Sequence, residues 1–222
     1  MAPAKASTLS NAVLGISSIL SILYGLDTLS PPSYWRMFTK AGSTSLLAAY
    51  SHLRGGPTLL SAALALGSVG DAFLAWDGEM PFLLGLGSFL MAHLLYIPLF
   101  SKKGRGVAGI QAETWRVGAA AILVALTSMM IKILVPRVES DLRVPILVYA
   151  TTIAGMVLSS LTQESGRVIA GAVYFTISDS ILATERFLLA PGSPHSVWMR
   201  YAVWILYYCG QGTIALGILD SK

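Results

Sequence analysis

Residues 81–100 read PFLLGLGSFLMAHLLYIPLF, twenty residues without one Asp, Glu, Lys or Arg. A transmembrane helix needs about 20 mostly apolar residues to cross the roughly 30 Å of hydrocarbon in a bilayer. The stretch therefore predicts a membrane-spanning helix, and the rest of the chain contains more segments of the same kind.

Eight such stretches follow one another when Pro, Gly and charge clusters are taken as boundaries. They cover 11–30, 37–53, 57–76, 81–100, 116–135, 144–160, 167–189 and 197–219. The second and sixth are the weakest, because they are short or interrupted by polar residues. The predicted fold class is all-α: an integral membrane bundle of about eight transmembrane helices. It forms one domain over 1–222, with a short polar N-terminal tail over 1–10.

The overall composition supports a membrane protein. Of the 222 residues 55% are hydrophobic and only 12% are charged, and the mean hydropathy is +0.68. Soluble domains carry about 25% charged residues, and a chain this short cannot bury so much apolar surface in an aqueous core. The single cysteine, Cys209, excludes an intramolecular disulfide and a cysteine-cluster metal site. Its apolar surroundings predict a small buried side chain.

The basic residues predict the orientation of the bundle. An even number of spans places both termini on one side, and eight Lys and Arg fall there against four on the other, which predicts cytoplasmic termini. The eight are Lys5, Arg54, Lys102, Lys103, Arg105, Arg116, Arg167 and Lys222. The first apolar stretch is too long for a signal peptide, so a retained span is expected. In a eukaryote we expect the endoplasmic reticulum or another internal membrane. No basic run with interleaved aromatics is present, so a nucleic-acid partner is not expected.

Two aspartates lie inside predicted spans, Asp71 in 57–76 and Asp179 in 167–189. Inserting an aspartate near the middle of a helix costs roughly 2.5–3.5 kcal/mol, and such residues usually face a polar interior and mark function. Each lies in the pattern small-Asp-x-x-Leu-Ala, in spans four apart. This predicts a parallel four-helix repeat with both aspartates at similar depth; the alternative is chance similarity.

Other polar residues share helix faces with each other. Lys40 lies in the first turn of its span, His93 and Tyr96 are three apart, and Tyr207 and Gln211 are four apart. At 1.5 Å per residue these residues and the aspartates fall between the end away from the termini and slightly past the midplane. They predict one polar cavity that opens away from the termini, with Asp71 facing Asp179.

Each of these residues also has a structural interpretation. Lys40 could extend to the headgroups, and His93 could be a buried histidine bonded to a carbonyl, since one histidine makes a poor metal site. Tyr207 and Gln211 could form hydrogen bonds between helices.

Four motifs follow in order along the third, fourth, seventh and eighth spans. They are Gly70-Asp71-x-x-Leu74, Phe82-x-x-Gly85-x-x-x-Phe89-x-x-x-His93-x-x-Tyr96, Gly171-Ala172-x-x-Phe175-x-x-Ser178-Asp179-x-x-Leu182, and Tyr207-x-x-x-Gln211-x-x-Ile214. Together they resemble the lysoplasmalogenase (YhhN-like) family of membrane proteins. One departure is that Ala41-Gly42 follows Lys40, where family members often have a proline.

The resemblance implies hydrolysis of the vinyl-ether bond of lysoplasmalogens to a fatty aldehyde and a glycerophospho-base, without a metal or cofactor. It implies a lysophospholipid substrate held among bilayer lipids. The implied catalytic pair is Asp71 and Asp179. The implied substrate-binding residues are Lys40, His93, Tyr96, Ser178, Tyr207 and Gln211.

A pair of aspartates suits this chemistry. Cleavage of a vinyl ether needs one protonated acid to deliver a proton to carbon, and one carboxylate to stabilise the cation and activate water. Glycosidases use two carboxyl groups in the same way. Two other classes remain open: a proton-coupled transporter, which also carries intramembrane aspartates, and a non-catalytic lipid-binding protein. No Gly-x-Ser-x-Gly motif indicates a serine hydrolase.

Overall fold

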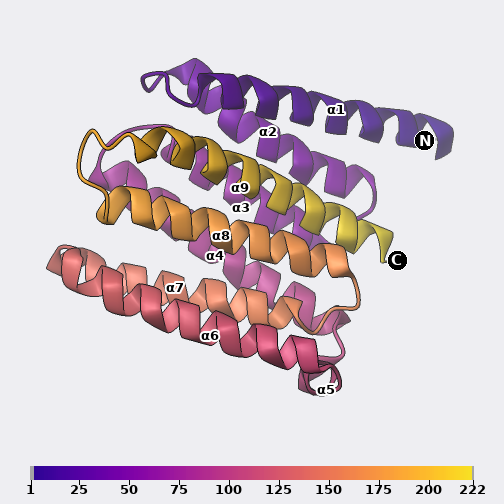
Figure 1. Cartoon of the computed structure of the whole chain (residues 1–222). Coiled ribbons are helices and arrows are strands. Elements are labelled where there is room, and N and C mark those ends of the chain that lie inside the picture. The colour runs from indigo at the N-terminus through magenta and orange to yellow at the C-terminus, as the bar shows by residue number, and fades with distance from the viewer. Residues whose placement is uncertain (1–2, 222) are drawn as a thin grey trace.

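The computed structural model describes residues 3–221, and these fold entirely into helices joined by short loops (Figure 1). The all-α prediction is therefore confirmed. The described helices are α1 (Pro3–Asp27), α2 (Tyr34–Leu53), α3 (Thr58–Phe73), α4 (Glu79–Lys103), α5 (Gly106–Gln111), α6 (Thr114–Leu134), the single 3-10 turn η1 (Val135–Arg137), α7 (Ser140–Ser160), α8 (Gly166–Phe187) and α9 (His195–Asp220).

Each of the eight predicted stretches coincides with one long helix, but three expectations need correction. The helix α1 begins at Pro3, so the described part of the expected polar tail is helical. Alanine and lysine are good helix formers and extend the helix beyond its apolar part. The loop expected over 101–115 contains α5. Cys209 is exposed on α9 instead of buried, because an apolar residue of a membrane helix can face lipid as well as the core.

Within residues 3–221, six helices are long and apolar enough to cross a membrane: α1, α4, α6 with η1, α7, α8 and α9. This supports an integral membrane protein. The other two expected spans differ. The helix α3 has 16 residues, about 24 Å at 1.5 Å per residue. The helix α2 buries polar residues, among them Thr39, Lys40 and Thr44, toward the interior, which lowers its hydropathy.

The long helices lie roughly along one common axis (Figure 1). Helices α1 and α2 form one side of the bundle, α6 and α7 form the other, and α3, α4, α8 and α9 lie between them. The start of α1 and the end of α9 lie at the same end of the bundle, and α3 and α8 run in the same direction. The side of the membrane on which the termini lie stays a prediction.

The closest helix contact joins α8 and α9, and glycine makes it possible. A Cβ on Gly171 would lie 2.7 Å from the carbonyl oxygen of Gly210, and a Cβ on Gly210 would lie 2.9 Å from that of Gly171. Small residues let membrane helices approach until their backbones touch. The contact fixes the relation between α8 and α9, and Asp179 and Tyr207 lie about two turns and one turn from it.

Candidate active site

A cavity of about 190 Å³ lies among α1, α2, α3, α4, α8 and α9, and both Asp71 and Asp179 line it. Its lining also includes Thr28, Trp76 and Asp77, which lie in the α1–α2 and α3–α4 loops. These loops are at the end of the bundle opposite the termini (Figure 1). The two aspartates therefore face one polar cavity at the predicted end.

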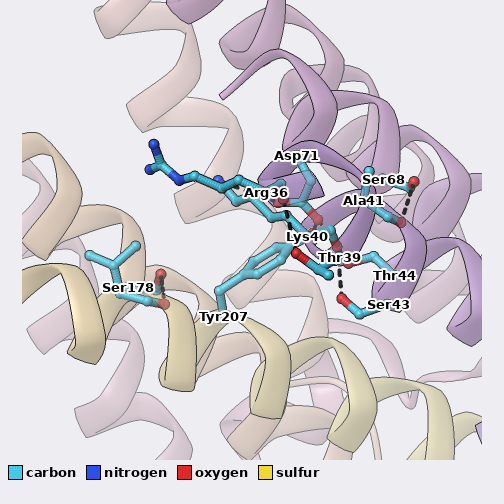
Figure 2. A network of polar contacts seen from close by, with 11 residues as sticks. Arg36, Thr39, Lys40, Ala41, Ser43, Thr44, Ser68, Asp71, Ser178 and Tyr207 are labelled. Carbon is cyan, nitrogen blue, oxygen red and sulfur yellow. Dashed lines mark hydrogen bonds and ion pairs between the residues drawn. The ribbon is translucent and has the colours of Figure 1, made fainter. Parts of the chain in front are cut away.

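Asp71 lies near the end of α3 and is only 1% exposed. Its Oδ2 accepts hydrogen bonds from Thr44 Oγ1 at 2.7 Å and from Tyr207 Oη at 2.8 Å, and these side chains converge on it in Figure 2. Lys40 Nζ lies 3.9 Å from Oδ1 and 5.5 Å from the centre of the Tyr24 ring. Lys40 therefore faces the interior and does not extend to the headgroups. A buried carboxylate needs such partners.

Two glycines give Asp71 this environment. A Cβ on Gly67, one turn before Asp71, would lie 3.0 Å from Gln211 Nε2 and 3.2 Å from Tyr207 Oη. A Cβ on Gly70 would lie 2.6 Å from the ring of Phe89. Because Gly67 and Gly70 carry no side chain, Tyr207 and Phe89 can reach the cavity beside α3.

Asp179 lies on α8, and 18% of its side chain is exposed. Tyr149 of α7 donates a hydrogen bond to its Oδ2. His93 Nε2 lies 3.2 Å from the Tyr149 oxygen and 4.0 Å from Asp179 Oδ2. Because Tyr149 donates its only proton to Asp179, its oxygen accepts from His93, which assigns the imidazole proton to Nε2. His93, Tyr149 and Asp179 thus form a chain of hydrogen bonds.

Tyr96 and Gln211 lie deeper in the bundle. Tyr96 Oη donates to Gln211 Oε1 at 2.5 Å, and both side chains are fully buried. Of the four residues expected in the cavity wall, only Tyr207 lines it; Tyr96, Gln211 and His93 do not. The prediction was wrong for these three because a shared helix face does not fix depth. Phe89, one turn before His93, lines the cavity, and its ring contacts Tyr207.

Ser178 lines the cavity beside Asp179. Its hydroxyl donates to the carbonyl of Val203 at 2.9 Å, which ties α8 to α9 (Figure 2). Its hydroxyl is therefore engaged in holding the helix that carries Asp179, and its role in substrate binding stays a prediction.

Sequence reasoning missed Thr44, Tyr149 and Arg36. Arg36 and Thr44 each lie four residues from Lys40. Helical spacing could therefore have placed these two residues on the same face of the helix as Lys40. No pattern marks Tyr149, because its contact joins two separate helices.

Arg36 lines the cavity and carries a buried Nε without a hydrogen-bond partner. In the described part of the chain no carboxylate forms an ion pair with it, whereas Arg200 pairs with Glu185 at 3.1 Å. A guanidinium that lacks a carboxylate partner and has an unpaired N–H group is suited to binding a phosphate, which it can hold through two parallel hydrogen bonds.

Comparison with known proteins gives a consistent set of relatives. The model of the YhhN family matches residues 35–218. The chain is 31% identical over 168 residues to human lysoplasmalogenase TMEM86B, covering 75% of this chain and 66% of that protein. It is 27% identical over 175 residues to human lysoplasmalogenase TMEM86A, covering 74% and 67%. The lysoplasmalogenase of Mycobacterium bovis is 31% identical over 147 residues, covering 63% and 54%.

The chain thus spans about two thirds or less of the length of these relatives. No solved structure matches it.

Proposed function

Because this chain belongs to the YhhN family, we propose that it is a membrane hydrolase that cleaves the vinyl-ether bond of lysoplasmalogens. The products are a fatty aldehyde and a glycerophospho-base. Relatives that match most of the chain are named lysoplasmalogenases. The observation that carries the proposal is the presence of two carboxyl groups, Asp71 and Asp179, in the lining of one cavity.

The reaction consumes one water and proceeds in three steps. A carboxylic acid delivers a proton to the outer carbon of the double bond, which leaves an oxocarbenium ion at the inner carbon. Water adds to this carbon and gives up a proton to a carboxylate, forming a hemiacetal. The hemiacetal then collapses: its C–O bond to glycerol breaks, the hydroxyl proton is lost, and the glycerol oxygen is protonated. General acid and base catalysis of this kind contributes about 10²- to 10⁴-fold each.

Asp71 is suited to act as the carboxylate. Lys40 faces one of its oxygens, and Thr44 and Tyr207 donate to the other. A negative charge held in this way can stabilise a cation that forms in the cavity and can orient the attacking water.

Asp179 is suited to deliver the proton. Tyr149 donates to its Oδ2, and no hydrogen bond to Oδ1 is found among the described side chains, so Oδ1 can carry the proton. The chain from His93 through Tyr149 fixes the carboxyl group in position. We assign His93 and Tyr149 a positioning role, since neither residue lines the polar cavity.

We place the phosphate of the substrate at Arg36. This guanidinium lies four residues from Lys40 on α2 and has a buried Nε that lacks a partner. A phosphate there would hold the glycerol backbone inside the cavity, with the ether bond pointing toward the aspartates.

An assay on the purified protein in detergent tests the proposal. We expect aldehyde release from lysoplasmenyl-choline and lysoplasmenyl-ethanolamine, and none from an ester-linked lysolipid. Ion-driven solute uptake into liposomes without aldehyde release would instead favour the proton-coupled transporter. Lysolipid binding with neither activity would favour the non-catalytic lipid-binding protein.

A further inference from the structure

A second, almost wholly apolar cavity of about 470 Å³ lies between α6, α7 and α8. Its volume lies within the roughly 300–1,000 Å³ typical of ligand pockets. Side chains of α6 such as Leu126 and Met129 line one wall, and side chains of α8 such as Ile177 line another. We refer to this cavity as the apolar groove.

The groove exists because α6 is attached to the bundle mainly at its two ends. Over the whole of α6 only Arg116 and Leu134 are buried. The Arg116 guanidinium donates to the carbonyls of Leu161 and Gln163 at 2.6 and 2.7 Å. Between these ends none of its side chains is buried, and the helix lies at the outer edge of the bundle (Figure 1).

The groove is open on the side that would face lipid. Leu126 is 52% exposed, Met129 is 49% exposed and Ile177 is 43% exposed, although all three line it. A hydrocarbon chain can therefore pass between the groove and the surrounding bilayer without crossing water.

The groove borders the polar cavity. Phe82, Asp179 and Leu182 line both, and Asp179 is the one carboxylate among the described residues that line the groove. Asp179 thus lies at the boundary between an apolar and a polar compartment. In a lysoplasmalogen the vinyl-ether bond lies at the same boundary, between the hydrocarbon chain and the glycerophosphate.

We propose that the apolar groove binds the hydrocarbon chain of a single-chain ether lipid, which enters sideways from the bilayer between α6 and α8. The phosphate of the same molecule lies at the opposite end, near Arg36, so the ether bond is held at Asp179. This inference rests on the proposed function for the identity of the head group and the bond. The groove then selects substrates by chain length.

Two variants of adjacent residues on α6 test this. Thr127 lines the groove, whereas Ser128 is exposed and does not. The measured quantity is kcat/KM for a long-chain lysoplasmenyl-choline divided by kcat/KM for a short-chain one. We expect Thr127→Phe to lower this ratio at least about tenfold, because one methylene in an apolar pocket already changes selectivity by about 10-fold or more. We expect Ser128→Phe to leave the ratio unchanged. An unchanged ratio in folded Thr127→Phe would overturn the proposal.

A labelling experiment on the unaltered protein is independent of variant folding and of turnover. The probe is an alkyl-ether lysophosphocholine with a diazirine at the chain end, which lacks the double bond. We expect adducts on groove residues such as Met129 and Met130, reduced by excess unlabelled lipid. Equal labelling of Ile122 and Val124, which are exposed outside the groove, would indicate bulk lipid contact only and overturn the proposal. Absence of aldehyde release with groove labelling intact would instead refute the proposed reaction alone.

Discussion

Asp71 on α3 and Asp179 on α8 line the same cavity, yet their surroundings differ. Asp71 is 1% exposed and is contacted by a lysine and two hydroxyl groups. Asp179 has one hydroxyl donor, Tyr149, and borders the apolar groove. Two identical side chains on two membrane helices thus have different partners. This teaches that the neighbouring helices set the environment of each carboxyl group, and charge and hydrogen bonding in that environment decide which protonation state is favoured.

The largest effect is expected from removing either carboxyl group. Asp71→Asn and Asp179→Asn should each lower turnover about 1,000-fold, because an amide can neither deliver a proton nor carry a negative charge, and general acid or base catalysis contributes about 10²- to 10⁴-fold. Lysolipid binding should be retained in both variants. The melting temperature should be retained in Asp179→Asn and lowered in Asp71→Asn, which leaves the buried Lys40 without its carboxylate. The measurement is aldehyde release per folded molecule.

Removing both carboxyl groups should cost little more than removing one, because cooperating groups act as a unit. Substantial turnover per folded molecule in either Asn variant would remove that aspartate from the catalytic role.

The next effect concerns stability around Asp71. Lys40→Met leaves a buried carboxylate without its cation, and breaking a buried pair in this way costs about 3 kcal/mol in the free energy of unfolding. The double variant Lys40→Met/Asp71→Asn should recover most of this loss, because no charge is then left unpaired. Thermal melting of the single and double variants in detergent measures it. If Lys40→Met alone melts like the parent protein, the ion pair does not stabilise the fold.

A smaller effect separates the two tyrosines. Tyr149→Phe removes the one hydroxyl donor found on Asp179, so the carboxyl group can move, and we expect kcat to fall about tenfold or more. Tyr207→Phe leaves Thr44 and Lys40 on Asp71, and we expect a loss of about threefold, the size of a modest hydrogen bond. Steady-state kinetics of both variants give the comparison. Equal losses would mean that the two carboxyl groups are held equally firmly.

The smallest effect is expected at Gly67. A methyl group there approaches Gln211 and Tyr207 at 3.0 and 3.2 Å, so Gly67→Ala should lower the free energy of unfolding by about 1 kcal/mol through overpacking. Gly87 lies in α4 with nothing within 4 Å of the added atom, and Gly87→Ala is the matched control. The control should be neutral or slightly stabilising. A loss in both variants would point to a general helix effect and not to crowding of Tyr207.

Much of the fold could be predicted from the sequence alone. Residues 81–100 and 116–135 predict α4 and α6 because hydropathy over 20 residues is a local sum that depends on no distant contact. The same holds for Asp71 and Asp179: a charge within an apolar helix must find a polar interior, whichever helices supply it. Lys40 also lies in the interior of the bundle, as its place beside the expected cavity predicted.

The sequence was less informative where two helices meet. His93, Tyr96 and Gln211 share faces with cavity residues but lie behind the wall, because large rings such as Phe89 occupy the surface in front of them. The length of α3 was overestimated for a related reason: its apolar residues end in the loop at Trp76, and only hydrogen bonding decides where a helix stops.

The sequence by itself therefore determined that this protein is a membrane helical bundle with two interior aspartates. The length of an apolar stretch and the presence of an aspartate within it are local properties of the chain. Tertiary structure alone decided which donors each aspartate receives, and that an apolar groove meets the polar cavity at Asp179. These depend on contacts between residues far apart in the chain, such as Gly171 with Gly210 and Arg116 with Gln163. Helix packing sets such contacts, and no local pattern encodes how closely two helices approach.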